Sequence, residues 1–310
     1  MWVHRRSEEP SCTSIQCYWM KSKLSRVGST IKYITAKELS GGSPSVPSNE
    51  NVYKRFLVEG KKRKINNCEL IKYQHDYVLD HKQSLSMHKL VLKYKEPSCD
   101  KFLEKVMLTD ADIDIIERET KDQHKSSLWH ELRYGRITAS RAFEFSCCKS
   151  SDGNLMSLIM GGKLPDTSAM KRGRILEDGV RETVSAKLEK QINKSGLMLC
   201  KNYPMIAGSP DGICEDSVIE IKCPMSAKTF KNYIVDGKPA LKFYAQMQVQ
   251  MYLTGLKKGY FCVADPNYNE NKKVEVIYVS YDENYVSNFL NVIVTSWKEN
   301  VYPLLYRSIS

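Results

Sequence analysis

The sequence predicts an α/β fold in which helices flank a central mixed sheet. Two observations support this prediction. Segments with helical periodicity lie on both sides of a block of short apolar runs within residues 197–280. Inside that block, residues 209–224 have the alternating pattern of a two-strand hairpin. The chain has 310 residues, which is enough for one sizeable α/β domain with an extension.

The first part of the chain differs from the rest. Residues 1–105 hold few long periodic segments, and residues 40–48 have the Ser, Gly and Pro content of a linker. From residue 111 onward we expect three helices, then strands, a helix, two more strands and a closing helix. The expected ranges are 197–206, 212–214 and 218–223 for the first strands, 242–256 for the helix, 259–264 and 273–280 for the later strands, and 284–300 for the closing helix. We therefore predict a basic extension at 1–105 and a folded domain at 106–310.

Two of the expected helices carry polar residues of interest. Over residues 170–191, an apolar residue recurs at every fourth position from Leu176, and Glu177 lies at the edge of that stripe. A glutamate in such a place is most often solvated. Residues 246–251 read Gln-Met-Gln-Val-Gln-Met, which alternates like a strand. Because Pro239 and Gly255 bracket a segment of helical length, we predict a helix there.

Asp211 and Glu220 are the most informative pair of residues. If residues 215–216 form the turn of the hairpin, paired residues have numbers that total 431, and Asp211 lies opposite Glu220. The β-carbons of opposed residues are about 5 Å apart, and like charges at that distance are destabilising. Such a pair indicates a compensating cation, and a hard divalent ion with oxygen ligands suits two carboxylates.

Alternation along the second strand adds a third charge to this pair. Lys222 shares the face of Glu220, whereas Ile219 and Ile221 point to the opposite, apolar face. An alternative interpretation is an ordinary antiparallel hairpin whose charged face contacts water. Pro210 before Asp211, and Glu-x-Lys within an apolar strand, favour a functional site.

Five blocks in order carry a resemblance to a known family. They are Trp-His-Glu-Leu-Arg-Tyr-Gly-Arg-Ile-Thr-Ala-Ser at 129–140, Gly-Arg-Ile-Leu-Glu at 173–177, Ala-Gly-Ser-Pro-Asp-Gly at 207–212, Glu-Ile-Lys-Cys-Pro at 220–224, and Ala-Gln-Met-Gln at 245–248. Asp211 with the Glu-x-Lys at 220–222 resembles the signature of the PD-(D/E)xK nuclease superfamily. Together the blocks resemble the lambda-type phage exonuclease, or YqaJ-like viral recombinase, family.

This resemblance implies a restriction-endonuclease-like core and a Mg²⁺-dependent exonuclease that digests linear duplex DNA, from 5′ ends, in recombination or repair. Mn²⁺ is the expected substitute cation. Carried over by position, the resemblance makes Glu177, Asp211, Glu220 and the carbonyl of Ile221 the metal ligands. Lys222 then activates or orients the attacking water, and the resemblance leaves its protonation state open.

The resemblance also implies a binding site for a DNA phosphate. Arg133, Ser140 and Ser209 match the positions that hold the phosphate, and Gln248 matches a glutamine that helps to hold the substrate. The residues themselves support the first part, because Thr138 is a suitable N-cap and would place Ser140 in a first helical turn with free backbone amides. A lone arginine would otherwise be taken as a surface residue.

The implied partners are double-stranded DNA ends, a single-strand annealing protein and further copies of this chain. Two alternatives stay open at this point. One is an endonuclease of the same superfamily, and the other is a non-catalytic DNA-binding adaptor in recombination. The intact residues Glu177, Asp211, Glu220 and Lys222 argue against the adaptor.

Composition agrees with a polyanionic partner without identifying it. Lys and Arg total 47 against 36 Asp and Glu, giving a formal charge of +11, and residues 1–65 hold 13 of the basic and 5 of the acidic residues. The basic run at 61–64 leaves a nuclear location open. With no signal peptide and no apolar run of transmembrane length, a soluble intracellular protein is expected. The ten cysteines contain no Cys-x₂-Cys pair, which disfavours a zinc site or a disulfide framework.

Overall fold

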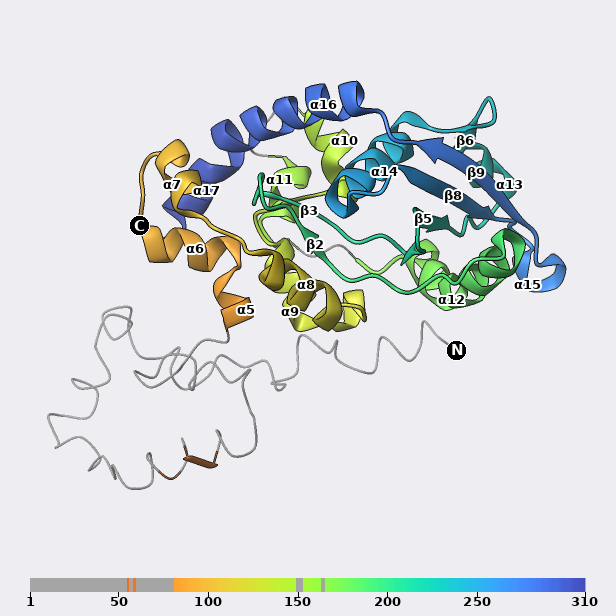
Figure 1. The fold of residues 1–310 in the computed structure, drawn as a ribbon, viewed down its shortest axis with the longest axis horizontal. Helices are drawn as coiled ribbons and strands as arrows, with labels where there is room; N and C mark the ends of the chain where they lie inside the picture. Colours follow the sequence, from red (N-terminus) through yellow and green to blue (C-terminus); the bar gives the residue numbers. More distant parts are fainter. Residues whose placement is uncertain (1–54, 56–57, 60–80, 149–152, 163–164, 310) are drawn as a thin grey trace, which may run out of the picture. The chain divides into compact units, whose positions relative to one another are not determined.

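The computed structural model describes residues 55, 58–59, 81–148, 153–162 and 165–309 (Figure 1). The linker expected at 40–48 and the basic run at 61–64 lie outside the described residues. The chain divides into two units, and the second comprises Val78–Ser310. That unit includes residues 81–105, which were predicted to belong to the N-terminal extension. Met87, Leu90 and Phe102 from this segment are buried in the largest hydrophobic core.

The described part of the second unit begins and ends with helices, and its strands lie between them in the sequence. The helices are α5 (His81–Ser84), α6 (Met87–Tyr94), α7 (Cys99–Lys105), α8 (Asp110–Glu119), η3 (Gln123–Lys125), α9 (Ser127–Arg133), α10 (Ala139–Cys147), α11 (Asn154–Ile159), α12 (Ser168–Leu188), α13 (Ala227–Lys231), α14 (Leu241–Thr254), α15 (Tyr268–Asn271), α16 (Glu283–Ser296), the π-helical turn η4 (Trp297–Val301) and α17 (Tyr302–Arg307). The strands are β1 (Ile137–Thr138), β2 (Met198–Leu199), β3 (Ile206–Gly208), β4 (Gly212–Ile213), β5 (Ser217–Lys222), β6 (Ile234–Val235), β7 (Lys238–Pro239), β8 (Lys258–Ala264) and β9 (Val274–Ser280).

The central sheet is mixed, as the sequence predicts. Its strand order is β4-β5-β8-β9, with β5 and β8 parallel and the two outer pairs antiparallel. In the β4–β5 hairpin, Gly212 lies opposite Ile219 and Ile213 lies opposite Val218. These residue numbers total 431, so the predicted register is confirmed. The register is fixed because a shift by one residue would turn the apolar face of β5 to the wrong side.

Two helices cover opposite faces of this sheet (Figure 1). The predicted apolar stripe of α12 packs against Ile219 and Ile221 on one face. On the other face, Met247 and Met251 of α14 pack against Val218. The segment 241–254 is therefore helical, as predicted, and the side chains of Glu220 and Lys222 share the α14 face with Val218.

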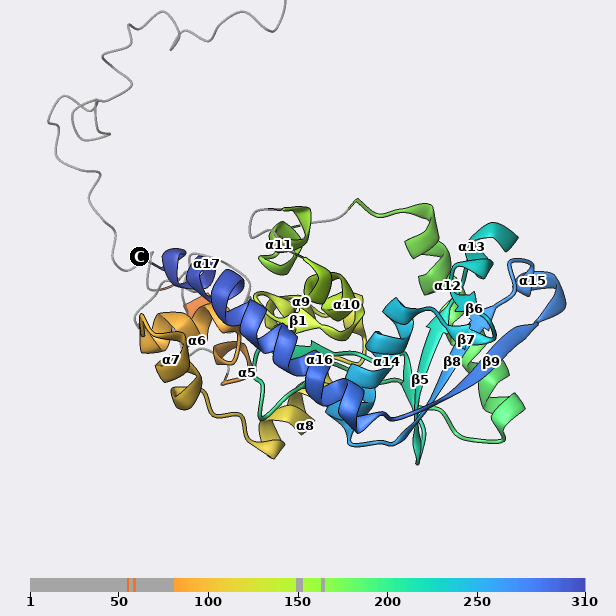
Figure 2. The same ribbon diagram turned by 90° about the horizontal axis from the view of Figure 1, so that it is seen from above.

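A smaller sheet, in the order β1-β3-β2, lies beside the other helices. β1 is parallel to β3, and α10 begins directly after β1, with Thr138 at its N-cap position as expected. α16 contacts both α10 and α14, and α17 contacts α6 (Figure 2). The phosphate motif at 129–140 thus spans α9, β1 and the start of α10. Among the described helices, none combines the length and apolar character needed to cross a membrane.

Candidate active site

Glu220 forms the buried centre of the predicted site. Its side chain is only 2% exposed although it lies in the middle of β5. One carboxylate oxygen accepts hydrogen bonds from Lys222 Nζ at 2.5 Å and from Gln246 Nε2 at 2.6 Å, and the other accepts one from Gln250 Nε2 at 2.7 Å. The charged face of the hairpin is therefore not the solvated face of an ordinary hairpin. A buried carboxylate is tolerated because its oxygens have donors.

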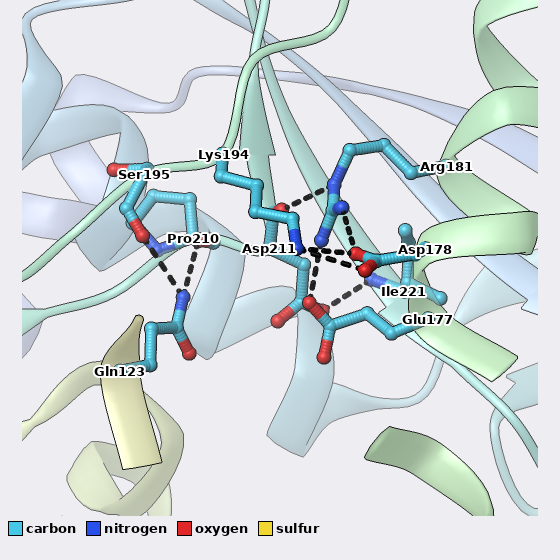
Figure 3. A network of polar contacts seen from close by, with 9 residues as sticks. All are labelled: Gln123, Glu177, Asp178, Arg181, Lys194, Ser195, Pro210, Asp211 and Ile221. Atoms are coloured by element: carbon cyan, nitrogen blue, oxygen red, sulfur yellow. Dashed lines mark hydrogen bonds and ion pairs between the residues drawn. The ribbon is translucent and has the colours of Figure 1, made fainter. Parts of the chain in front are cut away.

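Asp211 and Glu177 approach each other at the rim of the same sheet (Figure 3). Asp211 Oδ2 accepts a hydrogen bond from the backbone N–H of Ile221 at 2.7 Å, which fixes the carboxylate beside β5. Glu177, on α12, accepts one from Arg181 Nη2 at 2.5 Å. Arg181 also donates from Nε to the carbonyl of Asp211 at 2.9 Å, so it ties α12 to the start of the hairpin.

Arg181 was not among the residues predicted to form the site. The arginine is buried, and it also contacts Asp178, which in turn is paired with Lys194 at 2.7 Å (Figure 3). Its position four residues after Glu177 is the spacing at which opposite charges meet on a helix. That spacing was the available signal for Arg181.

Negative charge exceeds positive charge in this cluster. Its carboxylates are Glu177, Asp178, Asp211 and Glu220, and its cations are Arg181, Lys194 and Lys222. Burial, followed by the charges of Glu220 and Glu177, raises the pKa of Asp211 well above its ordinary value. Burial also raises the pKa of Glu177, although the positive charge of Arg181 opposes the shift. The positive charges nearby therefore do not fully offset burial and the negative charges around Asp211 and Glu177.

The donor set agrees with a hard divalent cation. The carboxylates of Glu177 and Asp211, together with the nearby carbonyl of Ile221, are oxygen ligands of the kind that Mg²⁺ takes. Within the described ranges, no group of three or more His, Cys, Asp or Glu side chains is arranged to hold a metal ion by itself. In this arrangement the oxygens of Glu220 are occupied by Lys222 and two glutamines. A direct ligand role for Glu220 stays a prediction.

Lys222 is held as a cation beside the carboxylates. Burial lowers the pKa of Lys222, but the negative charges of Glu220 and Asp211 outweigh burial and raise it above its ordinary value. The ammonium also lies 5.4 Å from the centre of the Phe243 ring. An ammonium in this environment donates hydrogen bonds and stabilises negative charge, so the geometry favours the orienting role for Lys222 over that of a base.

A second, positively charged cavity lies along α9 and the start of α10. It has a volume of about 730 Å³, and its lining includes Arg133, Arg136, Arg141 and Arg174. Arg174 is paired with Asp166, with its closest contact at 2.7 Å. No described carboxylate forms an ion pair with the other three arginines. Burial, followed by the charge of Arg141, lowers the pKa of Arg133 to about 10.

The predicted phosphate residues occupy this region in different ways. The guanidinium of Arg133 stacks on the ring of Trp129 at 3.8 Å, and Trp129 Nε1 donates to Ser209 Oγ at 2.9 Å. Arg133 and Ser209 are therefore joined through one tryptophan. Ser140 is exposed in the first turn of α10, with its Oγ 3.3 Å from Thr138 Oγ1. Thr138 lines the cavity, and Ser140 lies beside it.

Gln248 lines neither the arginine cavity nor the cavities beside the carboxylates, and Ser140 and Ser209 are also absent from the lining of the arginine cavity. Gln248 is fully buried, and it donates to the carbonyl of Ser280 at 2.7 Å and accepts from the N–H of Asp282 at 2.9 Å. Both ends of its amide therefore hold backbone between β9 and α16. Gln246 and Gln250, unlike Gln248, reach the carboxylate site, where both donate hydrogen bonds to Glu220. The alternating glutamines of α14 gave no signal of which pair faces the sheet.

Three cavities with lining residues in common extend from the arginines to the carboxylates. His124 and Arg174 line both the arginine cavity and a small cavity of about 90 Å³. Glu177 and Asp211 line that small cavity and also a third one of about 290 Å³, which Lys222 and Tyr233 share. The carboxylate pair thus lines both the 90 Å³ and the 290 Å³ cavities, and the smaller of these shares His124 and Arg174 with the arginine cavity.

Comparison with known families agrees with the motif order. Residues 128–257 match the YqaJ-like viral recombinase domain. These residues form the part of the chain that is similar to that family. All of the predicted site residues lie within it, from Arg133 in α9 to Gln248 in α14. Three further residues also lie inside these bounds, although the sequence had assigned none of them a role in the site. They are Arg181, Gln246 and Gln250.

Known structures and a curated relative are also similar to this chain. An alkaline exonuclease from Laribacter hongkongensis, LHK-Exo, is 25% identical with a TM-score of 0.52, covering 59% of this chain and 96% of that chain. LHK-Exo in complex with dAMP matches with the same identity and TM-score, covering 94% of that chain. The alkaline nuclease of Autographa californica nuclear polyhedrosis virus is 25% identical over 59% of this chain. The chain spans about half the length of that curated relative. The restriction-endonuclease-like α/β fold that the sequence predicted is confirmed.

Proposed function

We propose that this chain is a Mg²⁺-dependent deoxyribonuclease that degrades linear duplex DNA from its 5′ ends in recombination. The observation that carries the proposal is the position of the carboxylate pair. Glu177 and Asp211 line two cavities, and the smaller of these shares His124 and Arg174 with the arginine cavity. Neighbouring cavities with cations in one and carboxylates in the others suit a polyanion that is held at its end and cleaved nearby. The names of the relatives support the exonuclease class.

The residues divide the chemistry between binding and cleavage. In the arginine cavity, Arg133 and Arg141 hold a terminal phosphate, because guanidinium groups bind phosphate oxygens in pairs. Trp129 fixes Arg133 by stacking, and Ser209 fixes Trp129 by its hydrogen bond. The terminal phosphate thereby sets which phosphodiester lies beside Glu177 and Asp211. Positioning of this kind accounts for much of the acceleration in phosphate chemistry.

At the carboxylates, Glu177, Asp211 and the carbonyl of Ile221 would hold a divalent cation. When bound, Mg²⁺ neutralises charge on the phosphate and makes a bound water more acidic. Lys222 orients the attacking water through its ammonium and stabilises the negative charge that develops on the phosphate. Glu220 keeps Lys222 in place, since the two groups are 2.5 Å apart, and Gln246 and Gln250 keep Glu220 in place.

The test is digestion of linear duplex DNA with 5′-phosphate or 5′-hydroxyl ends, beside covalently closed circles, in Mg²⁺ or in EDTA. We expect Mg²⁺-dependent loss of linear DNA, faster from phosphate ends, with circles intact. Lys222→Ala serves as the inactive control, and it should bind DNA without cutting it.

Other outcomes distinguish the rival functions. Nicking of closed circles would identify an endonuclease. Binding of linear DNA by the wild-type protein with no hydrolysis in Mg²⁺ or Mn²⁺ would identify a non-catalytic adaptor. Faster digestion of 5′-hydroxyl ends would contradict the assignment of the arginine cavity to the terminal phosphate.

A further inference from the structure

Arg136 is an unusual component of the arginine cavity because it is buried. Its side chain is 1% exposed, whereas Arg133, three residues earlier, is half-buried and stacks on Trp129. Gly135, with a φ of 70°, reverses the chain between the two arginines, and a β-carbon there would lie 2.9 Å from Leu305. The two arginines on either side of this turn therefore differ in exposure, and only the second is fully buried.

The partners of Arg136 carry no net charge. Its Nε, Nη1 and Nη2 donate to the backbone carbonyls of Pro204, Leu132 and Leu85 at 2.8, 2.6 and 2.6 Å. No carboxylate in the described part of the chain forms an ion pair with it. Burial lowers the pKa of Arg136 to about 9, which still leaves it protonated at neutral pH. Carbonyl dipoles solvate the guanidinium, but the whole unit charge remains uncompensated.

That charge lies at the cavity proposed to hold the terminal phosphate, and Arg136 contributes to its lining. Water screens charges poorly in a buried site, so a buried cation acts more strongly on a nearby anion than an exposed one does. Burying a cation without a carboxylate is also costly. A negatively charged ligand would be attracted strongly by this buried cation, and its charge would offset the cost of burying the cation.

We propose that Arg136 is a specificity-determining residue whose buried charge makes the cavity select a terminal phosphate monoester over a terminal hydroxyl. The inference rests on the proposed function, and it assigns to Arg136 an effect through charge rather than through contact. A phosphate monoester carries close to two negative charges at neutral pH. It gains more from an uncompensated buried cation than a singly charged internal phosphodiester does.

A purely structural role is the competing explanation, because Arg136 joins three segments through their carbonyls. The chain offers a matched control in Arg172, which likewise donates only to backbone carbonyls, those of Pro224 and Pro266, and does not line the arginine cavity. Arg136→Met removes the charge and the hydrogen bonds, whereas Arg136→Lys keeps the charge and loses most of the bonds. Arg172→Met removes comparable bonds elsewhere.

The experiment compares kcat/KM for duplexes whose single free end carries a 5′-phosphate or a 5′-hydroxyl, the other end being blocked. Affinity for the same two duplexes is measured in EDTA, where no hydrolysis is expected. We expect Arg136→Met to lower the phosphate-to-hydroxyl ratio by about tenfold, equivalent to about 1.4 kcal/mol. Arg136→Lys and Arg172→Met should keep the wild-type ratio. Each ratio compares two substrates with one preparation, so loss of folded protein cancels.

A wild-type ratio in Arg136→Met would overturn the inference while leaving the proposed function intact. A ratio lowered equally in Arg136→Lys would show that the hydrogen bonds matter and the charge does not. If Arg136→Met cannot be purified, Arg136→Gln takes its place, because glutamine also removes the charge but can still donate to a backbone carbonyl. A wild-type protein that digests both ends equally would instead refute the terminal-phosphate cavity, and this inference with it.

Discussion

Replacing Asp211 by asparagine tests the charge balance of the site directly. Asparagine keeps an oxygen that can accept the hydrogen bond from the N–H of Ile221, now 2.7 Å from Oδ2, so the hairpin geometry should persist. What disappears is one negative charge beside Glu177 and Glu220, the two carboxylates whose charges contribute to raising the pKa of Asp211. Asp211→Asn should therefore stabilise the metal-free protein and abolish hydrolysis.

The magnitudes follow from these contacts. Charged residues in contact couple by about 0.5–3 kcal/mol, and we expect the metal-free variant to gain about 1 kcal/mol in the free energy of unfolding. For a domain of this size that gain is a rise of about 3 °C in Tm. In the wild type, Mg²⁺ at ten times its Kd should add about 1.4 kcal/mol, and the asparagine variant should lose most of this increment.

The pH dependence has a defined sign. The unfolded chain ionises Asp211 near its ordinary pKa of 3.8, whereas burial and then the neighbouring carboxylates raise the pKa in the folded state. Below both values the group is protonated in either state and costs nothing. As the pH rises above 3.8, the unfolded state loses its proton first, so metal-free stability falls until the folded-state pKa is passed. Asp211→Asn should make this fall smaller.

The assay is thermal unfolding of both proteins across pH, in EDTA and in Mg²⁺. Asp216→Asn provides the control, because Asp216 is paired with Lys190 and Lys258 away from the cavities. The hydrogen bond from Lys190 is the main reason that the pKa of Asp216 is lowered, so its neutralisation should have the opposite sign and preserve the Mg²⁺ increment. The reasoning fails if Asp211→Asn is less stable than the wild type in EDTA, or if it keeps the full Mg²⁺ increment.

Three further predictions concern neighbouring residues. Lys222→Ala should abolish cleavage while leaving DNA affinity within about threefold, because most of the binding charge lies in the arginine cavity; a cleavage assay and a binding titration check this. Gln250→Leu should leave one oxygen of Glu220 without its donor and lower the free energy of unfolding by about 1–3 kcal/mol, as measured by denaturant titration. Trp129→Phe removes the hydrogen bond to Ser209 but keeps an aromatic ring for Arg133. It should weaken the affinity for 5′-phosphate ends by about 3–10-fold in a binding titration, with little change for 5′-hydroxyl ends.

Local rules allowed the hairpin to be predicted well. A short polar turn and strict alternation fix which residues oppose each other, and the observed pairing of Gly212 with Ile219 follows from them. The apolar stripe of α12 was predictable for the same reason. The role of Glu177 in the site could not be predicted from periodicity, because an edge position on a helix does not show which part of the protein that edge faces. Only the resemblance of the surrounding block distinguished Glu177 from other glutamates of that helix.

Other features depend on tertiary geometry that has no periodic signal. Gln246, Gln248 and Gln250 are alike in sequence, and the rotation of α14 against the sheet decides that the outer two bind Glu220. Similarly, Arg133 and Arg136 stand three residues apart in one motif. The positive φ at Gly135, and the indole of Trp297 that donates to its carbonyl at 2.8 Å, determine which of them is buried. A contact between residues 162 positions apart is not readable from local pattern.

The separation of charge explains why binding and cleavage need different groups. Arginines without carboxylate partners can hold a phosphate by themselves, whereas the carboxylates around Asp211 repel one. A DNA end can therefore enter the arginine cavity in the absence of a divalent cation, but its backbone is repelled from Glu177 and Asp211. A cation at the carboxylates reverses that repulsion at the one place where cleavage is proposed. We therefore expect this excess of negative charge, which adds to the effect of burial in raising the pKa of Asp211, to make productive DNA binding conditional on a divalent cation.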